Sequence, residues 1–249
     1  MRVALFVTCL NDTLFPEVGR ATVEVLRRVG LDVEFPIAQT CCGQMHLNSG
    51  YRSEALAMLR RFVEAFSDYD LVVAPSASCA ATVRHHYPHL AEAAPGAESA
   101  RLATAVADLA PRVVDLSEAL LDVVGTADVG SCYPHRVAYH PTCHSLRLLQ
   151  IGDRPLRLLR AVTDLELVDI ERSEQCCGFG GTFSIKNAET SAAMAADKVA
   201  AVKASGAEVL TATDTSCLMH LGGSMARQHY GIRTVHLAEI LASTGPGTR

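Results

Sequence analysis

Two pairs of adjacent cysteines, each followed by glycine, constrain this chain more than any other feature. The sequence reads C-C-G at residues 41–43 and again at residues 176–178. Neighbouring Cα atoms lie about 3.8 Å apart, below the separation of roughly 4.4–6.8 Å that a disulfide usually spans. The total of nine cysteines is odd, so a structural disulfide framework explains them poorly. The pairs indicate metal or redox chemistry instead.

The cysteines form two series with matched spacing. The first cysteine precedes the pair by 32 positions in one series and by 33 in the other, and a last cysteine follows the pair by 37 or 40 positions. The series are Cys9, Cys41, Cys42 and Cys79, and then Cys143, Cys176, Cys177 and Cys217. Cys132 belongs to neither and is expected to be a buried or idle thiol. The chain is therefore predicted to be a duplication, with repeats over residues 1–127 and 128–249.

The hydrophobic pattern of each repeat predicts strands that alternate with helices. Apolar or alternating runs of strand length lie at 3–8, 31–35, 70–75 and 112–115, and again at 136–139, 165–170, 208–213 and 233–236. Segments with helical spacing lie between or after them, at 17–29, 53–66, 117–124, 155–162, 187–204 and 237–243. This order is typical of parallel sheets. We expect an α/β fold of two pseudo-symmetric, parallel-sheet halves that face each other.

Each cysteine of the two series is expected just past the C-terminal end of a strand. Because these ends share one edge of a parallel sheet, where α/β proteins bind ligands, four distant thiols come together in each half. The four glycines of the paired motifs are expected to allow close backbone approach and N–H donation to sulfur; they are Gly43, Gly178, Gly180 and Gly181. His140, at a strand end, is the histidine expected to face the bound group.

Four thiolates in one place can hold a zinc ion or an iron–sulfur cluster. Zinc sites are usually built from C-x₂₋₄-C knuckles, which this sequence lacks. Ligands from three separate loops favour a larger, polynuclear group. Zinc, and a thiol/disulfide role without metal, remain the alternatives.

The cysteine pattern resembles the cysteine-rich CCG domain of heterodisulfide reductase. That domain also occurs in the iron–sulfur subunits of glycolate oxidase and anaerobic glycerol-3-phosphate dehydrogenase. This chain has two tandem copies and no ferredoxin-type C-x₂-C-x₂-C-x₃-C segment. The phrases H-P-T-C-H, E-Q-C-C-G-F-G-G-T-F-S and D-T-S-C-L-M-H make it most similar to the lactate utilisation protein A family, over essentially the whole chain.

The resemblance implies a small cytoplasmic iron–sulfur subunit of an L-lactate-oxidising system, with one cluster per half, of the [4Fe–4S] type. The implied partners are a ferredoxin-like iron–sulfur subunit and a third small lactate-utilisation protein. The substrate of such a complex is lactate or another 2-hydroxy acid. Nothing in the sequence resembles a flavin or nicotinamide site, so we expect electron transfer within the complex rather than lactate oxidation by this chain alone.

One departure from the resemblance concerns the last motif of each repeat. In heterodisulfide reductase this motif is C-x-x-C and supplies a fifth thiolate to a non-cubane cluster. Ser76 and Asp214 stand at the positions of the additional cysteine in this chain. An ordinary cubane cluster, an oxygen ligand from Ser76 or Asp214, and zinc in one half all stay open.

Two other functions compete with electron transfer. A disulfide or thiol reductase of the heterodisulfide reductase type would cleave a substrate disulfide at its clusters, but the absence of the fifth cysteine in both halves argues against it. A zinc-held scaffold for partner assembly would need no electron transfer.

Charge and hydropathy exclude several classes of partner. The net charge is −5 and no lysine/arginine stripe stands out, which argues against nucleic acid and anionic membranes. No apolar run approaches the length of about 18 residues that a membrane span needs. The opening M-R-V-A-L-F-V-T-C has the pattern of a strand rather than a signal peptide. We therefore expect a cytoplasmic protein.

Overall fold

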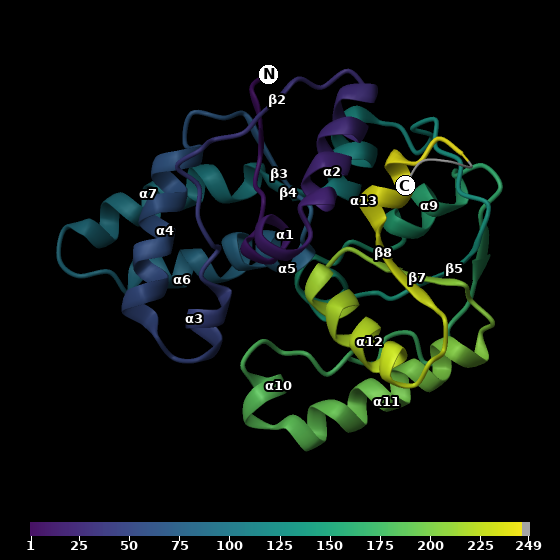
Figure 1. Cartoon of the computed structure of the whole chain (residues 1–249). Helices are drawn as coiled ribbons and strands as arrows, with labels where there is room; N and C mark the ends of the chain where they lie inside the picture. Colours follow the sequence, from purple (N-terminus) through teal and green to yellow (C-terminus); the bar gives the residue numbers. More distant parts are fainter. Residues whose placement is uncertain (246–249) are drawn as a thin grey trace.

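The computed structural model describes residues 1–245 and contains two halves of like architecture (Figure 1). The strands are β1 (Val3–Leu5), β2 (Val33–Glu34), β3 (Leu71–Ala74) and β4 (Val113–Asp115), then β5 (Arg136–Tyr139), β6 (Glu166–Val168), β7 (Val209–Ala212) and β8 (Arg233–His236). The helices of the first half are α1 (Cys9–Leu14), α2 (Pro16–Arg28), α3 (Gln44–Asn48), α4 (Arg52–Phe66), α5 (Ala77–Ala81), α6 (Tyr87–Glu92), α7 (Glu98–Leu109) and α8 (Leu116–Glu118). Those of the second half are α9 (Arg154–Arg160), α10 (Phe183–Lys186), α11 (Ala188–Ala204), α12 (Thr215–Arg227) and α13 (Leu237–Ala242).

Both sheets are parallel and share one strand order. The first runs β2-β1-β3-β4 and the second β6-β5-β7-β8. In the centre of each sheet Val3 pairs with Leu71 and Val137 pairs with Val209, so the registers match as well. The predicted α/β fold with one parallel sheet in each half is confirmed.

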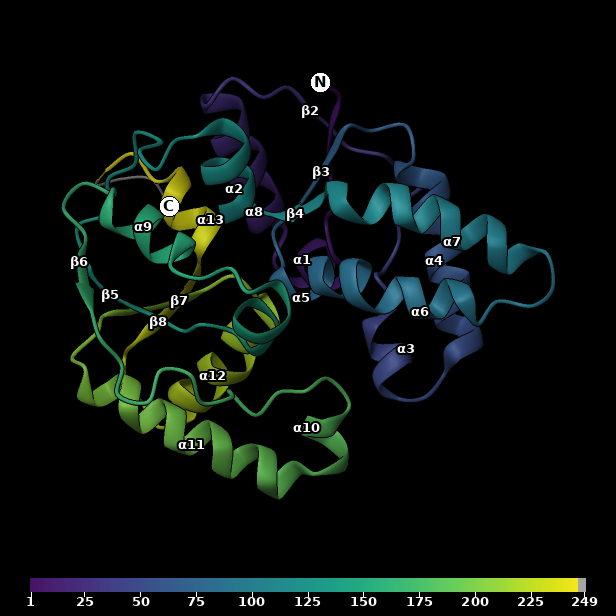
Figure 2. The same ribbon diagram turned by 180° about the vertical axis from the view of Figure 1, so that it is seen from behind.

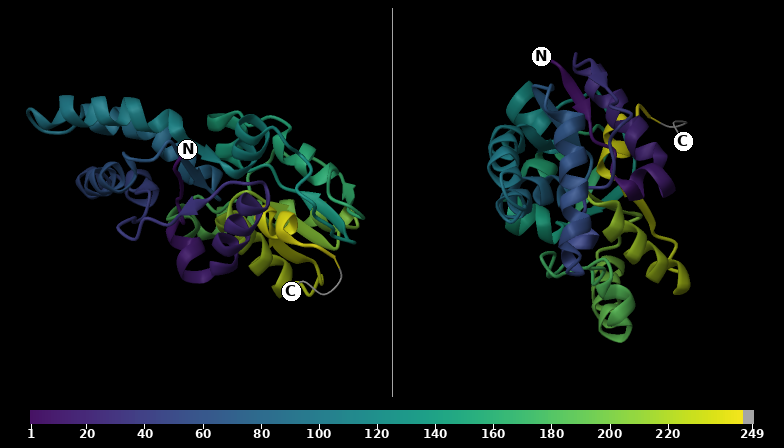
Figure 3. Two further views of the ribbon diagram at one scale, coloured as in Figure 1. Left: turned by 90° about the horizontal axis from the view of Figure 1, so that it is seen from above. Right: turned by 90° about the vertical axis from the view of Figure 1, so that its left-hand side faces the viewer.

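Alternation along the central strands divides the buried apolar side chains of residues 1–245 among three cores. Ala4 and Phe6 face the outer helices of the first half, α4, α6 and α7; Figure 2 shows α6 and α7 side by side on that flank. Ala138 and Leu210 pack in a separate core with α11 and α12. Seen from the side, α4 and α11 lie on separate parts of the molecule (Figure 3).

The inner faces of the two sheets contribute to one shared core. Val3 and Leu5 belong to the same buried cluster as Val137 and Tyr139, together with residues of α2, α8, α9 and α13. Helix α2 of the first half lies against α13 of the second (Figure 1). Because each half buries apolar surface against the other, the relative position of the two sheets is set by hydrophobic packing.

The helix predictions were incomplete: besides α12, they missed α7 and the short helices α1, α3, α5, α6 and α10. Helix α12 was not predicted, and its paired glycines Gly222 and Gly223 oppose helix formation in isolation. The helix forms because Leu218, Leu221 and Met225 pack into the core of the second half. The helix predicted over 117–124 is a single α-turn, α8, that continues into a π-helical segment at Ala119–Val124.

Within residues 1–245, no helix combines the length and apolar character needed to cross a lipid bilayer.

Candidate metal centre

The cysteines of both series lie at the carboxyl ends of strands, as predicted. Cys9 begins α1 directly after β1, and Cys79 lies in α5 after β3. In the second half, Cys143 follows β5 and Cys217 lies in the first turn of α12 after β7. The two adjacent pairs occupy the loops after β2 and β6. Strand geometry thus gathers four thiols in each half.

The structure adds that both groups of four line the same cavity. This cavity has a volume of about 130 Å³, and all eight cysteines of the two series contribute to its wall. The Sγ atoms of Cys9 and Cys41 lie 3.5 Å apart, those of Cys42 and Cys79 3.3 Å, and those of Cys177 and Cys217 3.1 Å; these cysteines are all free thiols. Eight sulfurs therefore converge on one space between the halves.

Cys132 lies apart from this cavity. It forms an isolated bridge with Thr163 and Thr244, and its thiol contacts the carboxylate of Asp164 at 3.5 Å. Cys132 was expected to be a buried or idle thiol outside both series. It is half-buried, and therefore less buried than a core thiol.

The first cysteine of each adjacent pair is set up to ionise. The neighbouring thiols, Cys42 and then Cys9, lower the pKa of Cys41 to about 2, and the backbone N–H of Gly43 assists from 3.4 Å. Cys176 has a pKa lowered to about 2 in the same way, by Cys143 and then Cys177. Thiolates are the form of cysteine that binds metals.

The structure shows why glycine follows each cysteine pair. Gly178 has φ +91°, and a Cβ there would lie 2.6 Å from the carbonyl oxygen of Ser191, so only glycine fits. Its N–H donates to the Cys176 sulfur at 3.3 Å, as predicted. Gly43 has φ +77° and makes the corresponding bond in the first half. Gly180 and Gly181 line the cavity wall itself.

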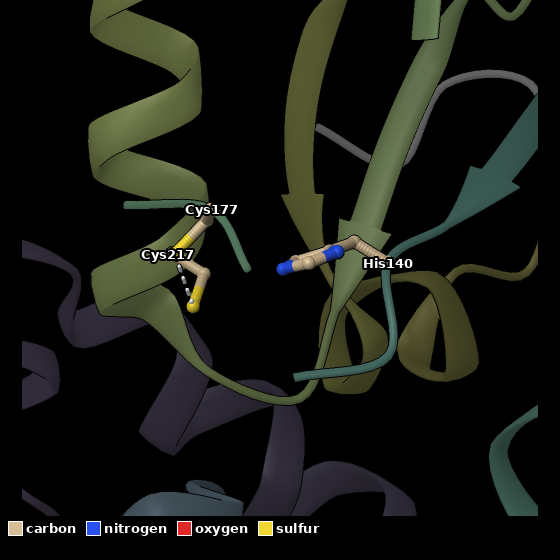
Figure 4. A group of neighbouring side chains, drawn as sticks. All are labelled: His140, Cys177 and Cys217. Atoms are coloured by element: carbon tan, nitrogen blue, oxygen red, sulfur yellow. Dashed lines mark hydrogen bonds between the residues drawn. The ribbon is translucent and has the colours of Figure 1, made fainter. Parts of the chain in front are cut away.

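His140 lies where the sequence placed it, beside the second cysteine group. One of its ring nitrogens and the sulfurs of Cys177 and Cys217 all lie within 4.8 Å of one another, and Figure 4 shows the ring directed towards the two sulfurs. The side chain is fully buried, and neither ring nitrogen has a hydrogen-bond partner in the described part of the chain. Burial lowers the pKa of His140 to about 4. An unpartnered, neutral imidazole thus faces two thiols.

Ser76 and Asp214 join the halves beside the cysteines. One Asp214 oxygen accepts hydrogen bonds from the Ser76 hydroxyl at 2.9 Å and the Ser78 N–H at 3.0 Å. The other accepts from the Thr142 hydroxyl at 2.5 Å. Both carboxylate oxygens are committed to hydrogen bonds, and Asp214 is buried. These two positions, considered above as oxygen ligands, hold the two cysteine groups against each other.

Comparison with known proteins places this arrangement in a family. The cysteine-rich domain family CCG matches residues 3–84 and 137–222, one copy in each half. Lactate utilization protein A of Geobacillus kaustophilus is 46% identical over 243 residues, covering 97% of this chain and 98% of that protein. The chain belongs to the lactate utilization protein A family.

Other members give the same result. The lactate utilization protein A of Oceanobacillus iheyensis is 44% identical over 241 residues, covering 97% of this chain and 96% of that protein. That of Bacillus subtilis is 41% identical over 243 residues, covering 98% and 100%. Among solved structures, allantoin racemase from Pseudomonas fluorescens aligns over 97% of this chain and 88% of its own, at 15% identity and a TM-score of 0.32, which does not establish a shared fold.

The donors of this family member fit a thiophilic metal group. Soft thiolates select zinc and iron–sulfur clusters, and the eight free sulfurs line one cavity. The N–H groups of Gly43 and Gly178 donate to two of these sulfurs, and the unpartnered ring of His140 lies beside Cys177 and Cys217. The chemistry of this donor set therefore suits either kind of group.

Several residues of the site belong to none of the sequence motifs described above. Asn11 donates to the Pro75 carbonyl at 3.0 Å and accepts from Thr215, which ties the first half to α12. The threonine before each first cysteine, Thr8 and Thr142, is repeated in both halves of this family member and was a signal that could have been found. Lys198, buried on α11, carried none.

Proposed function

We propose that this chain is a cytoplasmic iron–sulfur electron-transfer subunit of an L-lactate-oxidising system. The observation that carries the proposal is the convergence of eight free cysteines, four from each half, on one cavity. The names of its relatives supply the lactate connection. Each group of four would hold one cluster, of the [4Fe–4S] type, through Cys9, Cys41, Cys42 and Cys79 in the first half and Cys143, Cys176, Cys177 and Cys217 in the second.

Two centres in one small chain suit the chemistry of a 2-hydroxy acid. Oxidation of lactate releases two electrons, whereas an iron–sulfur centre accepts them singly. We propose a ferredoxin-like iron–sulfur subunit and a third small lactate-utilisation protein as partners, one of which would act on the substrate. The cysteine-rich repeats would comprise residues 1–127 and 128–249.

The deciding experiment is analysis of iron, acid-labile sulfide and zinc in protein purified without oxygen. We expect about eight iron and eight sulfide per chain, since each [4Fe–4S] cluster contains four of each. Cys41→Ser and Cys176→Ser should each remove about half. Cys132→Ser is the matched control and should change nothing, because Cys132 lies outside the cavity.

Two results would favour the other functions. Zinc without acid-labile sulfide would overturn the electron-transfer proposal and leave a zinc-held scaffold. Steady oxidation of a reduced low-potential dye by a disulfide, with both clusters present, would favour a disulfide reductase.

A further inference from the structure

The two halves place different residues behind their cysteine groups. Phe6 and His140 are structural equivalents, because each lies two positions before the threonine that precedes the first cysteine. Each also makes the same backbone hydrogen bond to the neighbouring strand: Phe6 N–H to the Val73 carbonyl at 2.9 Å, and His140 N–H to the Thr211 carbonyl at 2.8 Å. An apolar ring in one half thus corresponds to an imidazole in the other.

A second pair of equivalents lies on the helix after each C-C-G motif. The glycine of each motif faces a methionine: a Cβ on Gly43 would lie 3.2 Å from the Cβ of Met58, and one on Gly178 would lie 3.0 Å from that of Met194. Four residues further along the same helices, on the same face, stand Phe62 in the first half and Lys198 in the second.

In the first half these positions form an apolar wall. The rings of Phe6 and Phe62 pack edge to face with centroids 5.0 Å apart, and both are buried in the core that also contains Cys42 and Cys79. Neither ring can donate a hydrogen bond to a sulfur or compensate added negative charge.

In the second half the same positions carry a buried cation and an imidazole. Lys198 is 1% exposed. Its ammonium donates to the Arg172 carbonyl at 3.0 Å and the Ser173 carbonyl at 2.8 Å, at the start of the loop that carries Cys176. Within residues 1–245 no carboxylate forms an ion pair with it.

The positive charge of Lys198 interacts electrostatically with the second cysteine group. Burial lowers the pKa of Lys198, while the thiols of the group, led by Cys177, oppose that change. The same charge contributes to the lowered pKa of His140. The unpartnered ring nitrogens of His140 lie beside Cys177 and Cys217, as Figure 4 shows.

We propose that the centre in the second half has the higher reduction potential of the two, because the unpartnered ring of His140 is placed to donate an N–H hydrogen bond to that centre and Lys198 places a positive charge behind it. This inference rests on the proposed iron–sulfur function. Reduction adds one negative charge, and N–H donors and nearby cations stabilise the reduced form more than the oxidised form. An apolar wall does the reverse.

The consequence is a direction of electron flow. The first electron delivered to the chain by a reductant resides on the second-half centre, and only the second electron reduces the first-half centre. No bond is formed or broken in this exchange. The second half is then the end of the chain at which electrons collect.

The test is an anaerobic redox titration of the loaded full chain with dithionite and mediator dyes, followed by electron paramagnetic resonance. We expect two midpoint potentials, with the higher one lost in Cys176→Ser and kept in Cys41→Ser. His140→Phe and Lys198→Met should each shift the higher potential downward and leave the lower one in place. Lys203→Met, which removes an exposed charge from the same helix, is the matched control and should leave both unchanged.

Two further measurements distinguish the loss of a centre from a change in its reduction potential. Iron content shows whether a variant still holds both centres, and His140→Gln, which retains an N–H donor, should restore the higher potential. Equal midpoints, or loss of the higher one in Cys41→Ser, would overturn this inference while the cluster content upheld the proposed function. Wild-type protein without acid-labile sulfide would overturn both.

Discussion

Ser76 of the first half donates a 2.9 Å hydrogen bond to Asp214 of the second, across 138 positions of sequence. The two residues occupy equivalent places in the two repeats, three positions before the last cysteine of each series. The duplication therefore supplies both partners of a contact between its own copies. Since each residue is adjacent in the chain to a cysteine-bearing helix, the contact also sets the distance between the two cysteine groups.

Replacing Asp214 should weaken the contact between the two halves and lower the free energy of unfolding. In Asp214→Ala the Ser76 and Thr142 hydroxyls and the Ser78 N–H lose their buried acceptor, and we expect the free energy of unfolding to fall by about 3 kcal/mol. Asp214→Asn keeps an acceptor oxygen and should lose only about 1 kcal/mol. Denaturant unfolding measures both, and equal losses in the two variants would contradict the role of the carboxylate.

The glycine after the second cysteine pair should be irreplaceable. Gly178→Ala combines a positive φ with a Cβ only 2.6 Å from the Ser191 carbonyl oxygen, and we expect a loss of about 3 kcal/mol together with a loss of metal from the second half. The control is Gly152→Ala, where φ is +68° but no described atom lies within 4 Å. It should cost about 1 kcal/mol and leave the metal content unchanged. A Gly178→Ala protein with full metal content would refute the close-approach argument.

Arg28 should stabilise the interface between the two halves. Its guanidinium donates to the carbonyls of Val129, Leu241 and Ala242, the last two at 3.2 and 2.8 Å, at the C-terminal end of α13. We expect Arg28→Ala to lower the free energy of unfolding by about 2 kcal/mol. The exposed neighbour Arg27 serves as the control, and Arg27→Ala should change the value by less than about 0.5 kcal/mol. Thermal or denaturant unfolding of the pair checks this.

His236 should make the protein sensitive to acid. Its Nδ1 accepts from the Ala238 N–H at 3.1 Å at the start of α13, and burial lowers the pKa of His236 to about 4. In the unfolded chain a histidine has a pKa near 6.5, so the unfolded state takes up the proton first as the pH falls. This contribution to stability is present above about pH 6.5 and is lost as the pH falls towards 4.

The size of this acid effect can be measured with a variant that does not titrate. Between pH 7.5 and pH 5 we expect a loss of about 2 kcal/mol from His236. His236→Asn retains a helix-capping acceptor, and its free energy of unfolding should fall less over the same range. His85→Asn, which changes an exposed histidine, should keep the wild-type slope. An unchanged slope in His236→Asn would show that other groups control the acid sensitivity.

Much of the fold could be predicted because its signals are local. The alternation along Val3–Leu5 and Arg136–Tyr139 and the helical spacing of residues 17–29 come from neighbouring side chains, which decide the element type by themselves. Helix α12 escaped prediction because Gly222 and Gly223 weaken its local signal and only packing against the sheet compensates.

The duplication, the two parallel sheets and the strand-end position of the eight cysteines in the two series could be predicted from the sequence. These follow from periodicity and from repeated motifs, which are properties of short segments. Only the packing of the folded chain shows that the two cysteine groups share one cavity and that Asp214 bridges them. Those relationships depend on how two sheets bury a common core, and contacts between residues more than a hundred positions apart leave no pattern within either segment.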